Sequence, residues 1–225
     1  ESMSVILNID TSMGTAGVCL SAEGNMLAMA ESQDQKNHSS WLHPAIRRLL
    51  AETGYRPGDL LAVAVTAGPG SYTGLRVGMA AAKGFCYALG IPLIAENTLN
   101  MMAFAAREQL PEADLLCPMI DARRMEVFTA VYDREGKLLL PATAMVIDEN
   151  SFSEFLPGRS MAFFGDGSYK CKPLIKAPDA AFVNPAWHVG YLGKLSFLRY
   201  LHKEFTGVVY SEPVYTKDFH SHTKK

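Results

Sequence analysis

Two stretches of the sequence follow the same pattern, and this repetition constrains the fold more than any other feature. Residues 4–29 read SVILNIDTSMGTAGVCLSAEGNMLAM, and residues 115–140 read LLCPMIDARRMEVFTAVYDREGKLLL. Each stretch has an apolar strand ending in Ile-Asp, a turn, an alternating strand, a Glu-Gly turn and a third strand. Three strands and both turns in register indicate an internal duplication. We therefore predict two similar α/β halves, residues 3–109 and 110–225.

The segments outside these repeats alternate between helix and strand periods in the first half and are less regular in the second. The predicted elements of the first half are a helix over 37–54, a buried strand over 60–70, a helix over 71–90, a strand over 91–98 and a helix over 99–110. The second half has a short strand before a Gly-Asp-Gly turn, an amphipathic helix over 188–205 and a closing segment over 211–219. We therefore expect the second half to be a reduced version of the first.

Composition is that of an ordinary globular protein. Hydrophobic residues make up 48% of the 225 residues and charged residues 20%, with a net charge of -2. Because there is no basic excess, any role with RNA would need the charge of a partner protein. The four cysteines are scattered without Cys-x-x-Cys spacing, which favours free thiols in a reducing cytoplasm. We read Glu1-Ser2 as a tag remnant and find no run long enough for a membrane span.

A glycine-rich segment, TAGPGSYTGLRVG at 66–78, joins a predicted strand to a predicted helix. Gly68 and Gly70 allow a sharp turn, and Ser71 and Thr73 can cap the helix, whose N-terminal N–H groups suit an anion. The segment is neither a Walker loop nor Gly-x-Gly-x-x-Gly, and it has no Gly-x-Ser-x-Gly elbow. Two interpretations stay open here: a phosphate cradle, or a tight strand-to-helix turn.

The duplicated arrangement resembles the actin-like ATPase and sugar-kinase superfamily, built from two ribonuclease-H-like halves, here with the second reduced. In that superfamily the first hairpin of each half grips nucleotide phosphates. DTSMGTAG and DARRMEVF stand at these positions, so the resemblance implies phosphate-loop-like roles for Asp10, Thr11 and Asp121. The first departs from the usual Asp-x-Gly-Thr, and the second lacks the glycines. The two aspartates could instead be turn residues at strand ends.

Four segments are similar to the TsaB family, formerly YeaZ, which takes part in tRNA threonylcarbamoyladenosine synthesis. They read HSSWLHPAI, GPGSYTGLRVGMAAAKGF, IDARRMEVF and EPVY. In the catalytic paralogue TsaD, a histidine pair spaced i, i+4 binds a metal; here Thr98 and Met102 stand at those positions. A hydroxyl and a thioether make no hard-metal site, so we predict no metal and no tightly bound cofactor. His38 and His43 are spaced i, i+5, and we place His38 at the helix cap.

Small residues recur along the predicted helix over 71–90, which suggests that another backbone approaches it closely. The neighbour could be the first helix of the same half. The family resemblance implies instead that this face pairs with a second copy or with TsaD. On that basis the predicted partner interface comprises Leu42, Ile46, Gly74, Arg76, Gly78, Met79 and Ala82.

The resulting functional hypothesis is a non-catalytic, cytoplasmic scaffold subunit. It would pair with a TsaD-like enzyme that transfers threonylcarbamoyl to the adenosine next to the tRNA anticodon. A TsaE-like ATPase is a further expected partner, ATP or ADP is placed at the partner interface, and the chain alone is expected to form a homodimer. Two alternatives stay open: an active ATPase or kinase of the same superfamily, and a metal-dependent, glycoprotease-like peptidase of the M22 type. Nucleotide titration and metal analysis distinguish the three.

Overall fold

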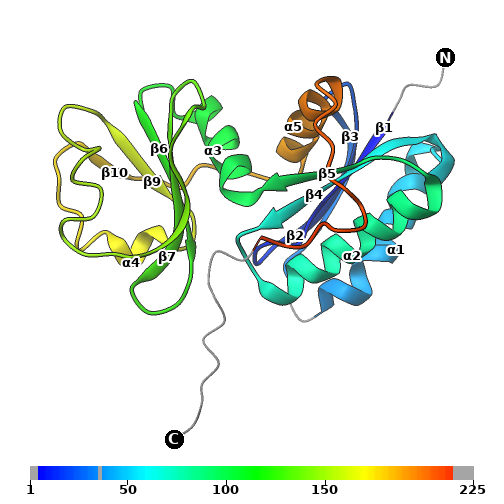
Figure 1. The fold of residues 1–225 in the computed structure, drawn as a ribbon, viewed down its shortest axis with the longest axis horizontal. Helices are drawn as coiled ribbons and strands as arrows, with labels where there is room; N and C mark the ends of the chain where they lie inside the picture. The colour runs from blue at the N-terminus through cyan, green and yellow to red at the C-terminus, as the bar shows by residue number, and fades with distance from the viewer. Residues whose placement is uncertain (1–4, 35–36, 215–225) are drawn as a thin grey trace, which may run out of the picture. The chain divides into compact units, whose positions relative to one another are not determined.

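The computed structural model describes residues 5–34 and 37–214, which form two compact units. The first unit contains a five-stranded sheet with the strand order β3-β2-β1-β4-β5 (Figure 1). Its strands are β1 (Val5–Asp10), β2 (Ala16–Ala22), β3 (Asn25–Ser32), β4 (Leu60–Gly68) and β5 (Leu93–Asn97). The first three strands form the antiparallel meander that the sequence predicts, and β4 and β5 run parallel to β1. Because both faces of β1 and β4 are covered, these strands are almost uniformly apolar.

Helices cover both faces of this first sheet. They are α1 (His38–Thr53), α2 (Tyr72–Leu89), the start of α3 (Thr98–Gln109) and α5 (Gly190–Leu201), with a short 3-10 turn, η2 (Pro57–Asp59), before β4. Helices α1 and α2 share one core with the sheet, and their C-termini are closed by left-handed glycines at positions 54 and 90. Side chains from α3 and α5 form a second core on the opposite face.

The second unit repeats the strand order of the first. Its sheet has the order β10-β9-β6-β7-β8, in which β6 takes the place of β1. The strands are β6 (Leu115–Asp121), β7 (Glu126–Asp133), β8 (Leu138–Val146), β9 (Met161–Phe164) and β10 (Ala180–Phe182). Among the described residues, no helix lies between β8 and β9, and only the four-residue α4 (Ser168–Cys171) stands where α2 stands in the first unit. The predicted fold class, two duplicated halves of which the second is reduced, is confirmed.

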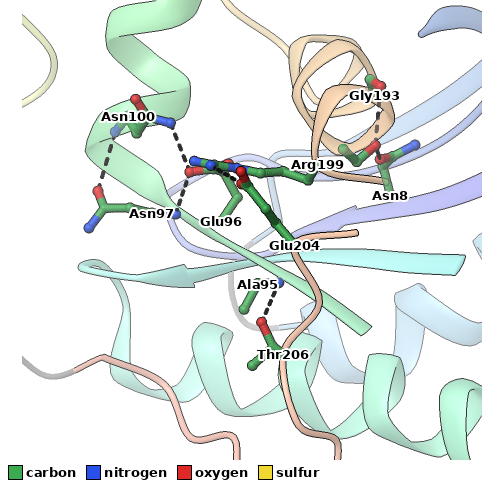
Figure 2. A network of polar contacts seen from close by, with 10 residues as sticks. Asn8, Ala95, Glu96, Asn97, Asn100, Gly193, Arg199, Glu204 and Thr206 are labelled. Carbon is green, nitrogen blue, oxygen red and sulfur yellow. Dashed lines mark hydrogen bonds and ion pairs between the residues drawn. The ribbon is translucent and has the colours of Figure 1, made fainter. Parts of the chain in front are cut away.

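The last helix belongs to the first unit, which corrects the predicted division at residues 109 and 110. The first unit runs to Ala106 and resumes over Ala186–Pro213, and the second covers Arg107–Pro185. The Ser196 hydroxyl of α5 donates a 2.6 Å hydrogen bond to the buried Asn8 side chain on β1, beside Gly193 (Figure 2). Helical periodicity identifies an amphipathic helix but cannot say which sheet it covers.

Within the described residues, none of the helices combines the length and apolar character that a membrane span requires.

Candidate functional site

The glycine-rich segment forms a tight turn between β4 and α2. Gly68 has φ of 113°, in the region that favours glycine. The Ser71 hydroxyl accepts a 3.2 Å hydrogen bond from the Gly74 N–H, so Ser71 is the N-cap of α2, whereas Thr73 lies within the helix and is exposed. The backbone N–H of Ser71 donates to the Ser12 carbonyl at 2.6 Å. The N–H groups of Ser71 and Gly74, which an anion would need, therefore already donate hydrogen bonds to atoms of the chain itself.

The turn between β1 and β2 fills the space that these glycines leave open. A Cβ atom at Gly74 would lie 2.0 Å from the Thr11 carbonyl oxygen, and one at Gly70 would lie 2.2 Å from the Ser12 carbonyl oxygen. The fully buried Thr11 hydroxyl donates to the Gly74 carbonyl at 2.7 Å and would meet a Cβ at Gly78 at 2.3 Å. The backbone that approaches α2 closely is thus the chain's own first hairpin turn.

Asp10 organises this hairpin turn. Its carboxylate is buried, and Oδ1 accepts hydrogen bonds from the Ser12 N–H at 3.0 Å, the Ser12 hydroxyl at 2.6 Å and the Thr66 hydroxyl at 2.6 Å. Burial raises the pKa of Asp10, and the hydrogen bonds from Ser12 and Thr66 oppose that rise. His38 is the first residue of α1 rather than its cap; its ring is buried and its Nε2 has no hydrogen-bond partner in the described chain.

Asp10→Asn is expected to flatten the pH dependence of stability. Because the folded-state pKa of Asp10 is raised, the contribution of Asp10 to stability is fully present below its unfolded pKa, about 4, and is lost as pH rises through the folded pKa. The neutral amide does not titrate, so this loss is absent from the variant. Its free energy of unfolding should therefore rise relative to that of the wild type between pH 4 and pH 7. Urea unfolding at several pH values measures this difference.

Asp114→Asn is the matched control for that pH experiment. Hydrogen bonds from Ser160 lower the pKa of Asp114, so its carboxylate contributes stability above pH 4 that is lost as pH falls. Above about pH 5 the deficit of Asp114→Asn relative to the wild type should therefore stay constant, and it should shrink only as pH falls below about 4. A parallel response of both variants would contradict the assignment of a raised pKa to Asp10.

The corresponding site of the second unit contains an internal cation. Lys170 forms an ion pair with Asp121 and donates to the Glu126 carbonyl at 2.7 Å, while the Asp121 N–H donates to Asp166 at 2.8 Å. The hydrogen bond from Lys170 keeps the pKa of Asp121 below its usual value. The loop reads GDGSYK, the counterpart of GPGSYT after β4, and the sequence interpretation did not use this match. Asp121 and Asp10 lie in different units.

Six of the seven residues predicted as the partner interface are buried within the first unit. The fully or almost fully buried side chains Leu42, Ile46, Met79 and Ala82 belong to the hydrophobic core of the first unit. Gly74 and Gly78 face Thr11. Arg76 is the exception: it is exposed, and its guanidinium lies 4.0 Å from the centre of the Tyr72 ring. The sequence pattern that marked these positions reflects the core, since inward-facing residues share one helical period.

The exposed side of the same two helices carries an apolar groove. Its volume is about 650 Å³, and the α2 residues that line it include Val77, Ala80, Gly84, Phe85 and Ala88. Helix α1 contributes Ser39 and His43, whose ring lies 6.2 Å from that of Phe85. Exposed arginines occur on both helices: Arg47 and Arg48 on α1, where Arg48 is paired with Glu52, and Arg76 on α2. The small residues that line the groove, such as Ala80 and Gly84, are interspersed along α2 with small residues that are buried, such as Gly78 and Ala82. The sequence analysis therefore did not separate the two faces of the helix.

Thr98 and Met102, the two positions that the resemblance compares with a metal-binding histidine pair, lie in apolar surroundings in this chain. Thr98 is fully buried at the start of α3 and its hydroxyl has no partner in the described chain, while Met102 is 1% exposed. The described residues contain no group of three or more His, Cys, Asp or Glu side chains that could hold a metal ion. All four cysteines are buried free thiols. His220 and His222 lie outside the described residues.

Comparison with known proteins places the chain in a family. A family model described as TsaD, tRNA N6-adenosine threonylcarbamoyltransferase, matches residues 28–192. TsaB of Bacillus subtilis, a tRNA threonylcarbamoyladenosine biosynthesis protein, is 39% identical over 134 residues, or 60% of this chain and 57% of that protein. YeaZ from Pseudomonas aeruginosa superposes with a TM-score of 0.76 and 27% identity, covering 95% of this chain and 100% of that one. The chain belongs to the TsaB (YeaZ) family.

Other TsaB proteins match over a similar extent. TsaB of Escherichia coli K12 is 34% identical over 130 residues, which are 58% of this chain and 55% of that protein. The matched part therefore spans little more than half the length of the curated relatives. A further structure, of an uncharacterized protein with similarity to peptidase YeaZ from P. aeruginosa, has a TM-score of 0.78 at 25% identity, covering 96% of this chain and all of that one.

Proposed function

We propose that this chain is a non-catalytic subunit in the synthesis of threonylcarbamoyladenosine in tRNA, and that it acts by pairing with a TsaD-like subunit. The observation that carries the proposal is the apolar groove between α1 and α2, on a chain whose phosphate-loop-like turn is closed by its own hairpin. A preformed groove with small residues lets a partner helix approach closely. In this proposal the turn between β4 and α2 holds the helix in position and takes no part in a reaction.

The exposed charges of α1 and α2 favour a different partner over a second copy. Arg47, Arg48 and Arg76 are exposed on these helices, and a second copy would carry the same positive charges. A TsaD-like surface with carboxylates at those places would complement them, so the homodimer should be the weaker assembly. The TsaE-like ATPase and tRNA enter through that heterologous complex, in the cytoplasm. ATP or ADP belongs at the partner interface, because the N–H groups of Ser71 and Gly74 are engaged within the chain.

Gly84→Leu tests the groove directly. A Cβ at Gly84 would meet no atom within 4 Å, so a leucine can be added without disturbing the chain's own packing. The leucine fills space that the partner needs; overpacking by 1–3 kcal/mol corresponds to roughly ten- to a hundredfold weaker binding. Sedimentation with and without a TsaD-like subunit measures pairing, and circular dichroism checks that the fold is retained.

Gly84→Ala is the graded control, because one added methyl should weaken pairing only slightly. Normal pairing by a folded Gly84→Leu chain would refute the groove as the interface.

ATP turnover by the isolated chain that is lost in Asp10→Ala would instead restore the ATPase alternative. In cells, replacement of the wild-type gene by Gly84→Leu should lower the threonylcarbamoyladenosine content of tRNA.

A further inference from the structure

The segment after α5, residues 204–213, runs along the edge of the first sheet; we call it the C-terminal strap. The Thr206 N–H donates to the Leu93 carbonyl at 2.8 Å, and the Thr206 hydroxyl accepts from the Ala95 N–H at 3.3 Å (Figure 2). β5 is the edge strand, so the strap satisfies backbone groups that an open edge would expose. Val208 packs against the core of the first unit. The strap is thus an ordered part of this unit.

Lys83 fastens the strap to α2. Its ammonium donates to the Val209 carbonyl at 3.2 Å and to the Ser211 carbonyl at 3.0 Å. These two carbonyls lie on either side of Tyr210 along the chain, so Lys83 fixes the strap at the point from which the Tyr210 side chain extends.

Two large aromatic side chains stand exposed beside this fastening. Tyr210 is 91% exposed on the strap, and Tyr87, one helical turn after Lys83, is 84% exposed on α2. Val209 is 70% exposed next to Tyr210. Exposed apolar groups that gather at one place mark interaction surfaces, and tyrosine is enriched among the residues that dominate binding.

Helix geometry makes this patch continuous with the groove. Successive residues of an α-helix are about 100° apart, so Tyr87 lies about 40° around the axis from Lys83, and Ala88 lies about 40° from Gly84. Around α2 from the strap toward α1, the exposed positions follow in the order Lys83, Tyr87, Ala80, Gly84 and Ala88. The last three line the groove. The strap and the groove therefore flank one exposed stripe of α2.

We propose that the strap is the second half of the partner-binding surface, with Tyr87 and Tyr210 as its aromatic anchors and Lys83 as the residue that positions the strap. The inference rests on the proposed function and assigns new residues to the same contact. Its occupant is the TsaD-like subunit that fills the groove. The strap and the groove flank the same exposed stripe of α2, which assigns both to one occupant.

Tyrosine truncation tests the proposal in the full chain. Tyr87→Ala and Tyr210→Ala should each weaken pairing with the TsaD-like subunit tenfold or more, with unchanged thermal unfolding, since neither side chain is buried in the free chain. Tyr169→Ala is the matched control: this tyrosine is 60% exposed but lies in the second unit, and its loss should leave pairing unchanged. Phenylalanine at 87 or 210 should restore most of the affinity, because it retains the ring.

Lys83→Met tests the positioning role. The variant keeps the apolar stem but loses the ammonium donors, so the strap should exchange its amide hydrogens over 206–211 faster and pairing should weaken severalfold. Unchanged exchange and unchanged pairing would show that Lys83 does not position the strap.

The outcomes separate this inference from the proposed function. If Gly84→Leu weakens pairing but both tyrosine variants pair like the wild type, the strap inference is wrong and the groove proposal stands. If Gly84→Leu and the tyrosine variants all pair normally, both are wrong. If the tyrosine variants weaken self-association alone, the occupant of the strap surface is a second copy, and the assignment to a TsaD-like partner is overturned.

Discussion

Replacing Gly74 with alanine is expected to destabilise the first unit by about 3 kcal/mol, the upper end of the usual effect of overpacking. The new methyl would lie 2.0 Å from the Thr11 carbonyl oxygen, a backbone atom that cannot rotate away. Either the hairpin turn or the first turn of α2 must move, and the hydrogen bond from the Thr11 hydroxyl to the Gly74 carbonyl would be broken. Urea unfolding followed by circular dichroism measures the change.

Gly84→Ala provides the matched control within the same helix. No atom lies within 4 Å of a Cβ at that position, and alanine is more favourable than glycine in a helix by up to about 1 kcal/mol. This variant should therefore unfold at higher urea than the wild type. Equal unfolding midpoints for Gly74→Ala and the wild type would mean that the hairpin turn does not pack on α2 as described.

The contrast between Gly74 and Gly84 shows what can be predicted from the sequence alone and what cannot. Small residues along α2 predict a close approach, and the approach is real at Gly74 and Gly78. The sequence does not say what approaches, because Thr11 is 63 residues from Gly74 in the chain and its position depends on the pairing of β1 with β4. The family resemblance favoured a partner, but the nearer neighbour is internal. The exposed small residues on the other side of α2 line the groove instead.

Other features follow the same division between local and tertiary information. The strands, the meander and the cap at Ser71 were predictable from alternation, turn residues and capping chemistry. The placement of α5 on the first sheet was not, because its apolar face fits either sheet. The match between GPGSYT and GDGSYK was visible in the sequence, but the role of Lys170 against Asp121 depends on how α4 packs on β6 and β7.

Glu96→Ala is expected to destabilise the first unit by about 3 kcal/mol, the low end of the effect of breaking a buried ion pair. Glu96 is 3% exposed, and its Oε1 accepts from the Asn97 N–H at 3.0 Å and the Asn100 amide at 2.8 Å (Figure 2). Oε2 accepts from Arg199 at 3.1 Å. Alanine would leave these donors without their acceptor. Arg199 is 40% exposed and retains its second carboxylate, Glu204, which keeps the effect at the lower end.

Glu204→Ala is the control for Glu96→Ala, because both carboxylates pair with the same guanidinium. Glu204 is 49% exposed, so its removal should change the free energy of unfolding by less than about 1 kcal/mol.

The two variants also separate stability from pairing. Arg199 links Glu96 at the end of β5 to Glu204 at the start of the strap, so Glu204→Ala should loosen the strap and weaken pairing severalfold in a chain of nearly normal stability. Equal unfolding free energies for both variants would show that burial of Glu96 contributes little, and the stability of this corner would then depend on the apolar contacts of α3 and α5.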